Sequence, residues 1–171
     1  MNPLPLSQIA QFAEASLSSG DGSAMIDKLS TDSRTLKRGE LFVALRGENF
    51  DGHDFVQAAA KAGAAGAIVE SNWRGKVPET FGLVRAKDTL QTYQQLAANY
   101  RKSLALKVVG ITGSNGKTST KDFSASVLAR RFQVTKTEGN FNNHVGLPRT
   151  ILDATSRDEV AVWGDRHESP W

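Results

Sequence analysis

The residues with the clearest chemical potential lie in a glycine-rich segment at positions 113–119. In order they are Gly113, Ser114, Asn115, Gly116, Lys117, Thr118 and Ser119. A glycine-rich turn of this kind directs backbone N–H groups toward a single bound anion. We expect the Lys117 ammonium to reach the β- and γ-phosphates of a nucleotide and the Thr118 hydroxyl to ligate Mg²⁺. The segment therefore predicts a phosphate-binding loop.

This loop departs from the usual phosphate-loop consensus, which places a glycine five positions before Gly116. The sequence has Ile111 there, with glycines at 110 and 113 instead. A Gly-Lys-Thr triplet can also occur by chance in a turn. The flanking elements favour phosphate binding, because an apolar run at 106–112 predicts a strand before the loop and a helix is predicted after it. Three apolar residues share one face of that helix: Phe123, Val127 and Leu128.

The elements that precede the loop predict a smaller α/β unit. A first helix is expected to begin at 5–7, and the Ser/Gly stretch 18–22 is typical of a turn. The continuous apolar run 41–45 indicates a buried strand. Asp54 is then predicted to cap a helix that Gly63 ends.

The same alternation continues to the phosphate loop. Strands are predicted at 67–69 and 81–84, and Asp88 is expected to cap a connecting helix within 86–106. The α/β pattern restarts at 107 with the strand, loop and helix described above. We therefore predict an α/β fold, with a small N-terminal α/β domain at 1–85 and the start of a parallel sheet from 107.

Composition is that of an ordinary globular protein, with 39% hydrophobic and 23% charged residues. The net charge of +3 comes from scattered Lys and Arg residues, which favours a solvated surface over nucleic-acid binding. The absence of cysteine excludes disulfides, Cys-ligated zinc and thiol catalysis. No signal-peptide pattern and no run of apolar residues long enough for a membrane span is present. We expect a cytoplasmic protein without nucleic-acid or membrane partners.

Three segments of the chain resemble the Mur ligase family. The loop 112–119 resembles the ATP-binding loop of Mur ligases and of their folylpolyglutamate synthase relatives. The segment 138–148 is similar to a loop of the branch that adds D-alanyl-D-alanine, and its asparagines, Asn140, Asn142 and Asn143, are suited to donating hydrogen bonds to phosphate or sugar oxygens. Without the family, it is only a turn-rich polar loop.

The third segment, 31–55, resembles the N-terminal domain that holds the UDP part of the substrate. There Ser33 and Arg34 can hydrogen-bond uracil or pyrophosphate, Arg34 by a charge-assisted fork. The alternative is that both residues lie at the end of a surface strand. His53 in the same segment is more typical of a structural histidine, and we assign it no chemistry.

The resemblance implies an ATP- and Mg²⁺-dependent ligase. In this family ATP phosphorylates a substrate carboxylate, and an amine then attacks the acyl phosphate. For this branch the substrates are UDP-MurNAc-tripeptide and D-Ala-D-Ala. The implied organisation is a UDP-binding domain at 1–85, a connecting helix at 86–106 and an incomplete ATP-binding domain at 107–163, in which Lys117 is the catalytic residue.

The end of the chain departs from the family. Residues 160–163 match the opening of a family strand whose first Glu ligates Mg²⁺, but residues 164–171 do not match the remainder of that family motif. Removing one G from one possible codon series for 163–171 restores the family motif. We therefore expect a frameshifted tail, and a truncated chain that is inactive alone.

Two alternatives remain open. The chain could be a module that binds a nucleotide or a UDP-sugar without turning it over. It could also be a sister ligase of the MurE type or a folylpolyglutamate synthase, although the asparagines at 140–143 argue against both.

Overall fold

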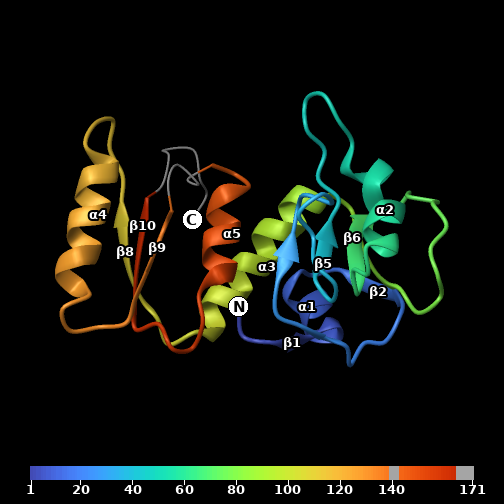
Figure 1. Cartoon of the computed structure of the whole chain (residues 1–171), viewed down its shortest axis with the longest axis horizontal. Coiled ribbons are helices and arrows are strands. Elements are labelled where there is room, and N and C mark those ends of the chain that lie inside the picture. Colours follow the sequence, from blue (N-terminus) through green and yellow to red (C-terminus); the bar gives the residue numbers. More distant parts are fainter. Residues whose placement is uncertain (139–142, 165–171) are drawn as a thin grey trace. The chain divides into compact units, whose positions relative to one another are not determined.

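The computed structural model describes residues 1–138 and 143–164 and divides the chain into two compact units. One unit is Pro3–Asn99, and the other combines Met1–Asn2 with Tyr100–Trp171. Each contains parallel strands flanked by helices (Figure 1). The predicted α/β fold class, with a parallel sheet behind the glycine loop, is confirmed.

The unit Pro3–Asn99 is built on a five-stranded sheet in the order β2-β7-β6-β5-β4. These strands are β2 (Ser16–Ser19), β4 (Leu29–Ser30), β5 (Leu41–Val43), β6 (Gly66–Glu70) and β7 (Gly82–Ala86). Only β2 is antiparallel to its neighbour; β4 to β7 pair in parallel. A separate antiparallel ribbon joins β1 (Leu4–Pro5) to β3 (Met25–Ile26).

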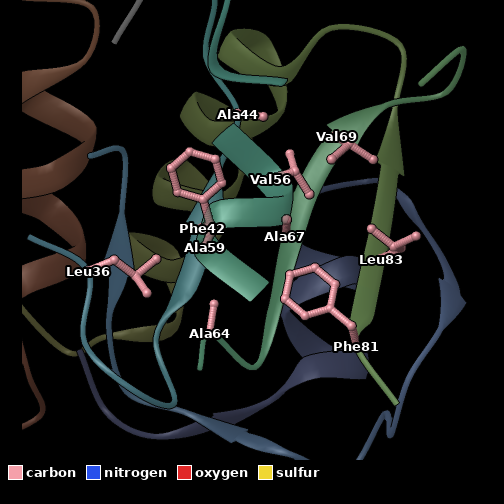
Figure 2. Packing of buried hydrophobic residues seen from close by; sticks show 10 residues of the cluster. All are labelled: Leu36, Phe42, Ala44, Val56, Ala59, Ala64, Ala67, Val69, Phe81 and Leu83. Atoms are coloured by element: carbon pink, nitrogen blue, oxygen red, sulfur yellow. The ribbon is translucent and has the colours of Figure 1, made fainter. Parts of the chain in front are cut away.

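Apolar residues of this sheet are buried on both faces. Successive strand residues point to opposite sides, so Phe42 packs toward α2 (Val56–Lys61) while Leu41 and Val43 are buried on the other side. Figure 2 shows the cluster on the α2 side, which includes Leu36, Phe42, Ala44, Val56, Ala59, Ala64, Ala67, Val69, Phe81 and Leu83.

The helix α1 (Leu6–Phe12) packs closely against β7. A Cβ added to Gly82 would lie 2.4 Å from the Leu6 side chain, so glycine permits this approach. The helix α3 (Thr89–Ser103) begins where predicted, because the Asp88 side chain accepts a hydrogen bond from the Gln91 N–H at 2.9 Å.

Two local predictions are wrong. Asp54 does not cap the second helix; Asp51 has the extended backbone of a cap and accepts from the His53 N–H, starting a 3₁₀ turn η1 (Gly52–Phe55) that leads into α2. The stretch 18–22 is only partly a turn, because β2 continues to Ser19. Its pairing with β7, a tertiary interaction, outweighs the local turn preference of serine.

The second unit contains a three-stranded parallel sheet in the order β8-β10-β9. Its strands are β8 (Lys107–Ile111), β9 (Val134–Lys136) and β10 (Val160–Gly164), flanked by α4 (Lys117–Leu128) and α5 (Gly146–Asp153) (Figure 1). Gly164 pairs with Ile111, so β10 includes the first residue of the predicted tail. The rest of that tail, 165–171, lies outside the described residues.

Burial in this second sheet is uneven. The central strand β10 is fully buried, whereas Val108 and Val109 of β8 are each 39% exposed. On α4, Phe123 and Val127 are 73% and 56% exposed. The buried residues of α4 are instead Lys121 and Ala125, so Phe123 and Val127 lie on a different face of the helix, turned to solvent.

Candidate functional site

The glycine loop lies between the end of β8 and the start of α4. Gly113 and Gly116 have φ angles of +138° and +75°, in the region that residues with a side chain rarely adopt. A Cβ at Gly116 would meet no atom within 4 Å, so the loop needs glycine for its backbone conformation and not for space. The space beside the loop is open to a ligand.

The first turn of α4 provides the donors of an anion site. Its first described hydrogen bond within the helix runs from Thr120 N–H to Gly116 carbonyl at 2.9 Å. The preceding N–H groups, of Lys117, Thr118 and Ser119, belong to the turn whose amides point out of the helix N-terminus. The partial positive charge of that terminus favours a phosphate.

Lys117 folds back over the loop. Its ammonium donates to the Gly113 carbonyl oxygen, and the side chain is half-buried, while Thr118 is exposed. Within the described ranges no three His, Cys, Asp or Glu residues are grouped as a metal site. Thr118, the residue predicted to ligate Mg²⁺, lies in the first turn of α4 just beyond the end of β8, at the edge of the sheet where ligands of open α/β sheets bind.

The predicted asparagine loop is described only in part. Asn143 Oδ1 accepts from the Gly146 N–H at 2.7 Å and from the Val145 N–H at 3.3 Å, so this oxygen holds the start of α5. Its amide group could still donate to a ligand. Asn140 and Asn142 lie outside the described residues.

A cavity of about 510 Å³ lies in the unit Pro3–Asn99. Its lining comes from two segments and one strand residue: Thr31, Asp32, Ser33 and Arg34; Phe50, Gly52 and Phe55; and Phe42. Phe50 is 59% and Phe55 43% exposed, so both side chains present aromatic surface at the cavity. The cavity combines aromatic surface with hydrogen-bonding and charged groups, as small-molecule sites do.

Ser33 and Arg34, the predicted substrate contacts, both line this cavity. The Arg34 guanidinium donates two parallel hydrogen bonds to Asp32, from Nε at 2.9 Å and from the terminal nitrogen at 2.7 Å. These bonds lower the Asp32 pKa to about 2. Arg34 is thus held in place with donors left over, and its side chain is 87% exposed.

The sequence reasoning missed Asp32 as the anchor of Arg34 and missed Phe50 and Phe55 as lining residues. The contact between Asp32 and Arg34 could have been predicted, because an acidic residue lies two positions before the arginine. The aromatic lining had no comparable signal, because it requires the loop after β5 to fold back beside Thr31–Arg34.

No helix among the described residues is long and apolar enough to cross a membrane.

Two family models match the chain. The Mur ligase middle domain matches residues 111–163, and the model described as Mur ligase family, catalytic domain, matches residues 25–101. The UDP-N-acetylmuramoyl-tripeptide–D-alanyl-D-alanine ligase of Bacillus subtilis is 45% identical over 141 residues, covering 81% of this chain and 30% of the relative. The enzyme of the same name from Escherichia coli is 40% identical over 164 residues, covering 95% of this chain and 34% of the relative.

Solved structures agree with this assignment. MurF from Acinetobacter baumannii matches with a TM-score of 0.87 and 31% identity, over 97% of this chain and 36% of that protein. MurF from Thermotoga maritima, solved in complex with ADP, matches with a TM-score of 0.73 and 34% identity, over 84% of this chain and 33% of that protein. The chain thus spans about a third of the length of the relatives it matches. From the matched domains, the glycine loop and the shared fold, we conclude that this chain belongs to the Mur ligase family.

Proposed function

We propose that this chain is the nucleotide-binding part of a MurF-type ligase, which adds D-alanyl-D-alanine to UDP-MurNAc-tripeptide in peptidoglycan precursor synthesis. The observation that carries the proposal is the presence, in one chain, of a glycine phosphate loop and of an aromatic-lined cavity holding an oriented arginine. Relatives named for this reaction, at 45% and 40% identity, support it.

We assign UDP binding to residues 1–85 and its contacts to the cavity. The leftover donors of Arg34 and the Ser33 hydroxyl suit the pyrophosphate, because charge-assisted bonds from a fixed guanidinium are strong and directional. The exposed rings of Phe50 and Phe55 suit the flat face of uracil. Residues 86–106 would connect this domain to the next one.

We assign ATP binding to residues 107–163. The amides at the start of α4, with Ser114, Asn115 and Ser119, would surround the phosphates, and the asparagines at 140, 142 and 143 would donate hydrogen bonds to the substrate. Lys117 would exchange the Gly113 carbonyl for the β- and γ-phosphate oxygens. Thr118 would hold Mg²⁺, which supplies charge neutralisation when bound.

The reaction follows from this placement. ATP transfers its γ-phosphoryl group to the terminal carboxylate of the tripeptide, and the amine of D-Ala-D-Ala attacks the resulting acyl phosphate and releases phosphate. The residues of this chain would serve the first step, in which positioning and charge neutralisation by Lys117 and the loop amides dominate. We propose that the 171-residue chain binds both nucleotides without completing ligation.

Calorimetric titration of the 171-residue chain tests this function. We expect UDP-MurNAc-tripeptide to bind, Mg-ATP to bind more weakly, and no ADP release when D-Ala-D-Ala is added. Arg34→Ala should weaken the first ligand alone, and Lys117→Ala the second alone. If neither ligand binds, the proposal is wrong.

The rival function is a module that binds a nucleotide and takes no part in a ligase. This alternative function stays open because the chain matches only about a third of each relative. Tighter binding of ATP than of the UDP ligand would favour this rival function. It would mean that the phosphate loop and its metal site bind ATP fully without a contribution from the substrate domain.

We further propose a cytoplasmic location, where ATP and UDP-linked precursors are available.

A further inference from the structure

Behind the wall of the cavity lies a network of four side chains that the proposed function leaves without a role. It consists of Arg46, Asp51, His53 and Glu70, all in the unit Pro3–Asn99. None of the four lines the cavity, although Gly52 between two of them does. His53, which is buried, can therefore act on a ligand in the cavity only through other residues.

The His53 ring bridges the loop after β5 to the end of β6. It is 8% exposed, and its Nε2 accepts a hydrogen bond from the Glu70 backbone N–H at 2.9 Å. Because Nε2 acts as the acceptor, the ring proton is on Nδ1, which donates to Asp51 Oδ1 at 2.6 Å. A neutral imidazole with one donor and one acceptor fits both partners.

Asp51 is the centre of the network. Burial raises its pKa, but hydrogen bonds from the His53 backbone and ring, with the charge of Arg46, outweigh burial and leave the pKa below its ordinary value. Its second oxygen, Oδ2, accepts from Arg46 Nε at 3.0 Å, and the same guanidinium reaches Glu70 Oε2 at 2.9 Å. The four side chains thus form a continuous chain, which the Glu70 backbone N–H closes at His53.

This network closes the segment 46–51 into a hairpin. Arg46 and Asp51 form an antiparallel bridge, Gly47 N–H donates to the Phe50 carbonyl at 2.9 Å, and Gly52 N–H donates to the Leu45 carbonyl at 2.8 Å. The Phe50 ring lies over Gly47, where an added Cβ would be 2.7 Å from a ring carbon. The place of this exposed ring in the cavity wall follows from the hairpin.

We propose that His53 is a positioning residue for nucleotide binding: by tying the hairpin 46–51 to β6, it fixes Phe50 as a stacking surface for a planar heteroaromatic base. This rests on the proposed function, since the base is taken to be that of the UDP substrate. His53 itself does not touch the ligand. Without His53, the Phe50 ring samples positions in which it no longer contacts the base.

A double-mutant cycle with UDP as the probe separates positioning from general stability. We expect His53→Ala and Phe50→Ala each to lower UDP affinity about tenfold, and the double variant to bind no more weakly than Phe50→Ala, because both changes remove the same contact. His53→Asn, which can keep the bond to Asp51, should lose less. Ile9→Ala, a buried change in α1 away from the hairpin, should lower the melting temperature and leave the affinity unchanged.

Amide hydrogen exchange provides a readout without ligand. In His53→Ala, the amides of Gly47 and Gly52 should exchange faster, whereas those of β7 should not. Unchanged UDP affinity in His53→Ala, or additive losses in the double variant, would overturn the role of His53 while leaving the proposed function intact. Failure of the unaltered chain to bind UDP would overturn both.

Discussion

In the proposed function, Lys117 provides the charge that the glycine loop offers to phosphate. The Gly113 carbonyl that now accepts from it would lose one partner on nucleotide binding, and phosphate would gain a charge-assisted bond of about 1.5–3 kcal/mol. We predict that Lys117→Ala weakens Mg-ATP binding by about ten- to a hundredfold, measured by calorimetry. Lys136→Ala, which removes a lysine bound to Asp122 instead, is the control and should bind normally.

The titration of Asp32 tests whether its ion pair with Arg34 forms in solution. Hydrogen bonds from the Arg34 side chain lower its pKa to about 2, so the ion pair stabilises the folded state above the ordinary pKa and this contribution is lost as pH falls through about 2. Carboxyl chemical shifts of the folded chain should show Asp32 ionised down to that pH. In Arg34→Ala the midpoint should return toward about 3.9. An Asp32 midpoint near the ordinary value in the unaltered chain would mean that the pair does not form in solution.

Residue positions were predictable where they depend on neighbours in the sequence. Lys117 and Thr118 follow a glycine loop directly, so their place at the start of α4 could be derived from the sequence. His53 was different, because its acceptor role depends on the Glu70 amide, 17 positions away. The same applies to Phe50, which becomes a cavity residue only after the hairpin has formed.

The start of α4 allows a matched test of backbone strain. Gly116 and Gly39 have φ angles of +75° and +86°, and an added Cβ at either would meet no atom within 4 Å. Alanine at each should therefore destabilise its unit by about 1–2 kcal/mol through conformation alone. Denaturant unfolding should show similar losses for both variants. Gly116→Ala alone should also weaken Mg-ATP binding; equal ATP affinities would remove the loop from the site.

Element types could be predicted better than element boundaries. The alternating strands and helices were correct because apolar runs and their spacing are local signals. The cap was predicted three residues too late, because Asp54 directly precedes the apolar Phe55 and Val56, whereas the observed cap, Asp51, precedes Gly52 and His53. Exposure could not be predicted at Phe123 and Val127, since the helix buries a different face, with Lys121 and Ala125.

The second unit leaves apolar surface uncovered, which favours contact with other molecules. Parallel sheets are normally covered on both faces, yet β8 exposes Val108 and Val109, and α4 exposes Phe123 and Val127. We predict concentration-dependent self-association of the chain, measured by light scattering. Phe123→Glu combined with Val127→Lys should reduce it with less than about 0.5 kcal/mol change in stability, as expected for exposed positions. Self-association unchanged by this pair would place the contact elsewhere.

In the proposed function, this one chain carries two separate nucleotide sites of different chemistry. Backbone amide shift mapping of the isotopically labelled chain, titrated separately with UDP and with Mg-ATP, tests it most directly. We predict that UDP shifts the amides of 31–34 and 50–55, that Mg-ATP shifts those of 113–119, and that each set is unaffected by the other ligand. Both nucleotides shifting the same amides, or UDP leaving 31–34 and 50–55 unchanged, would contradict the account.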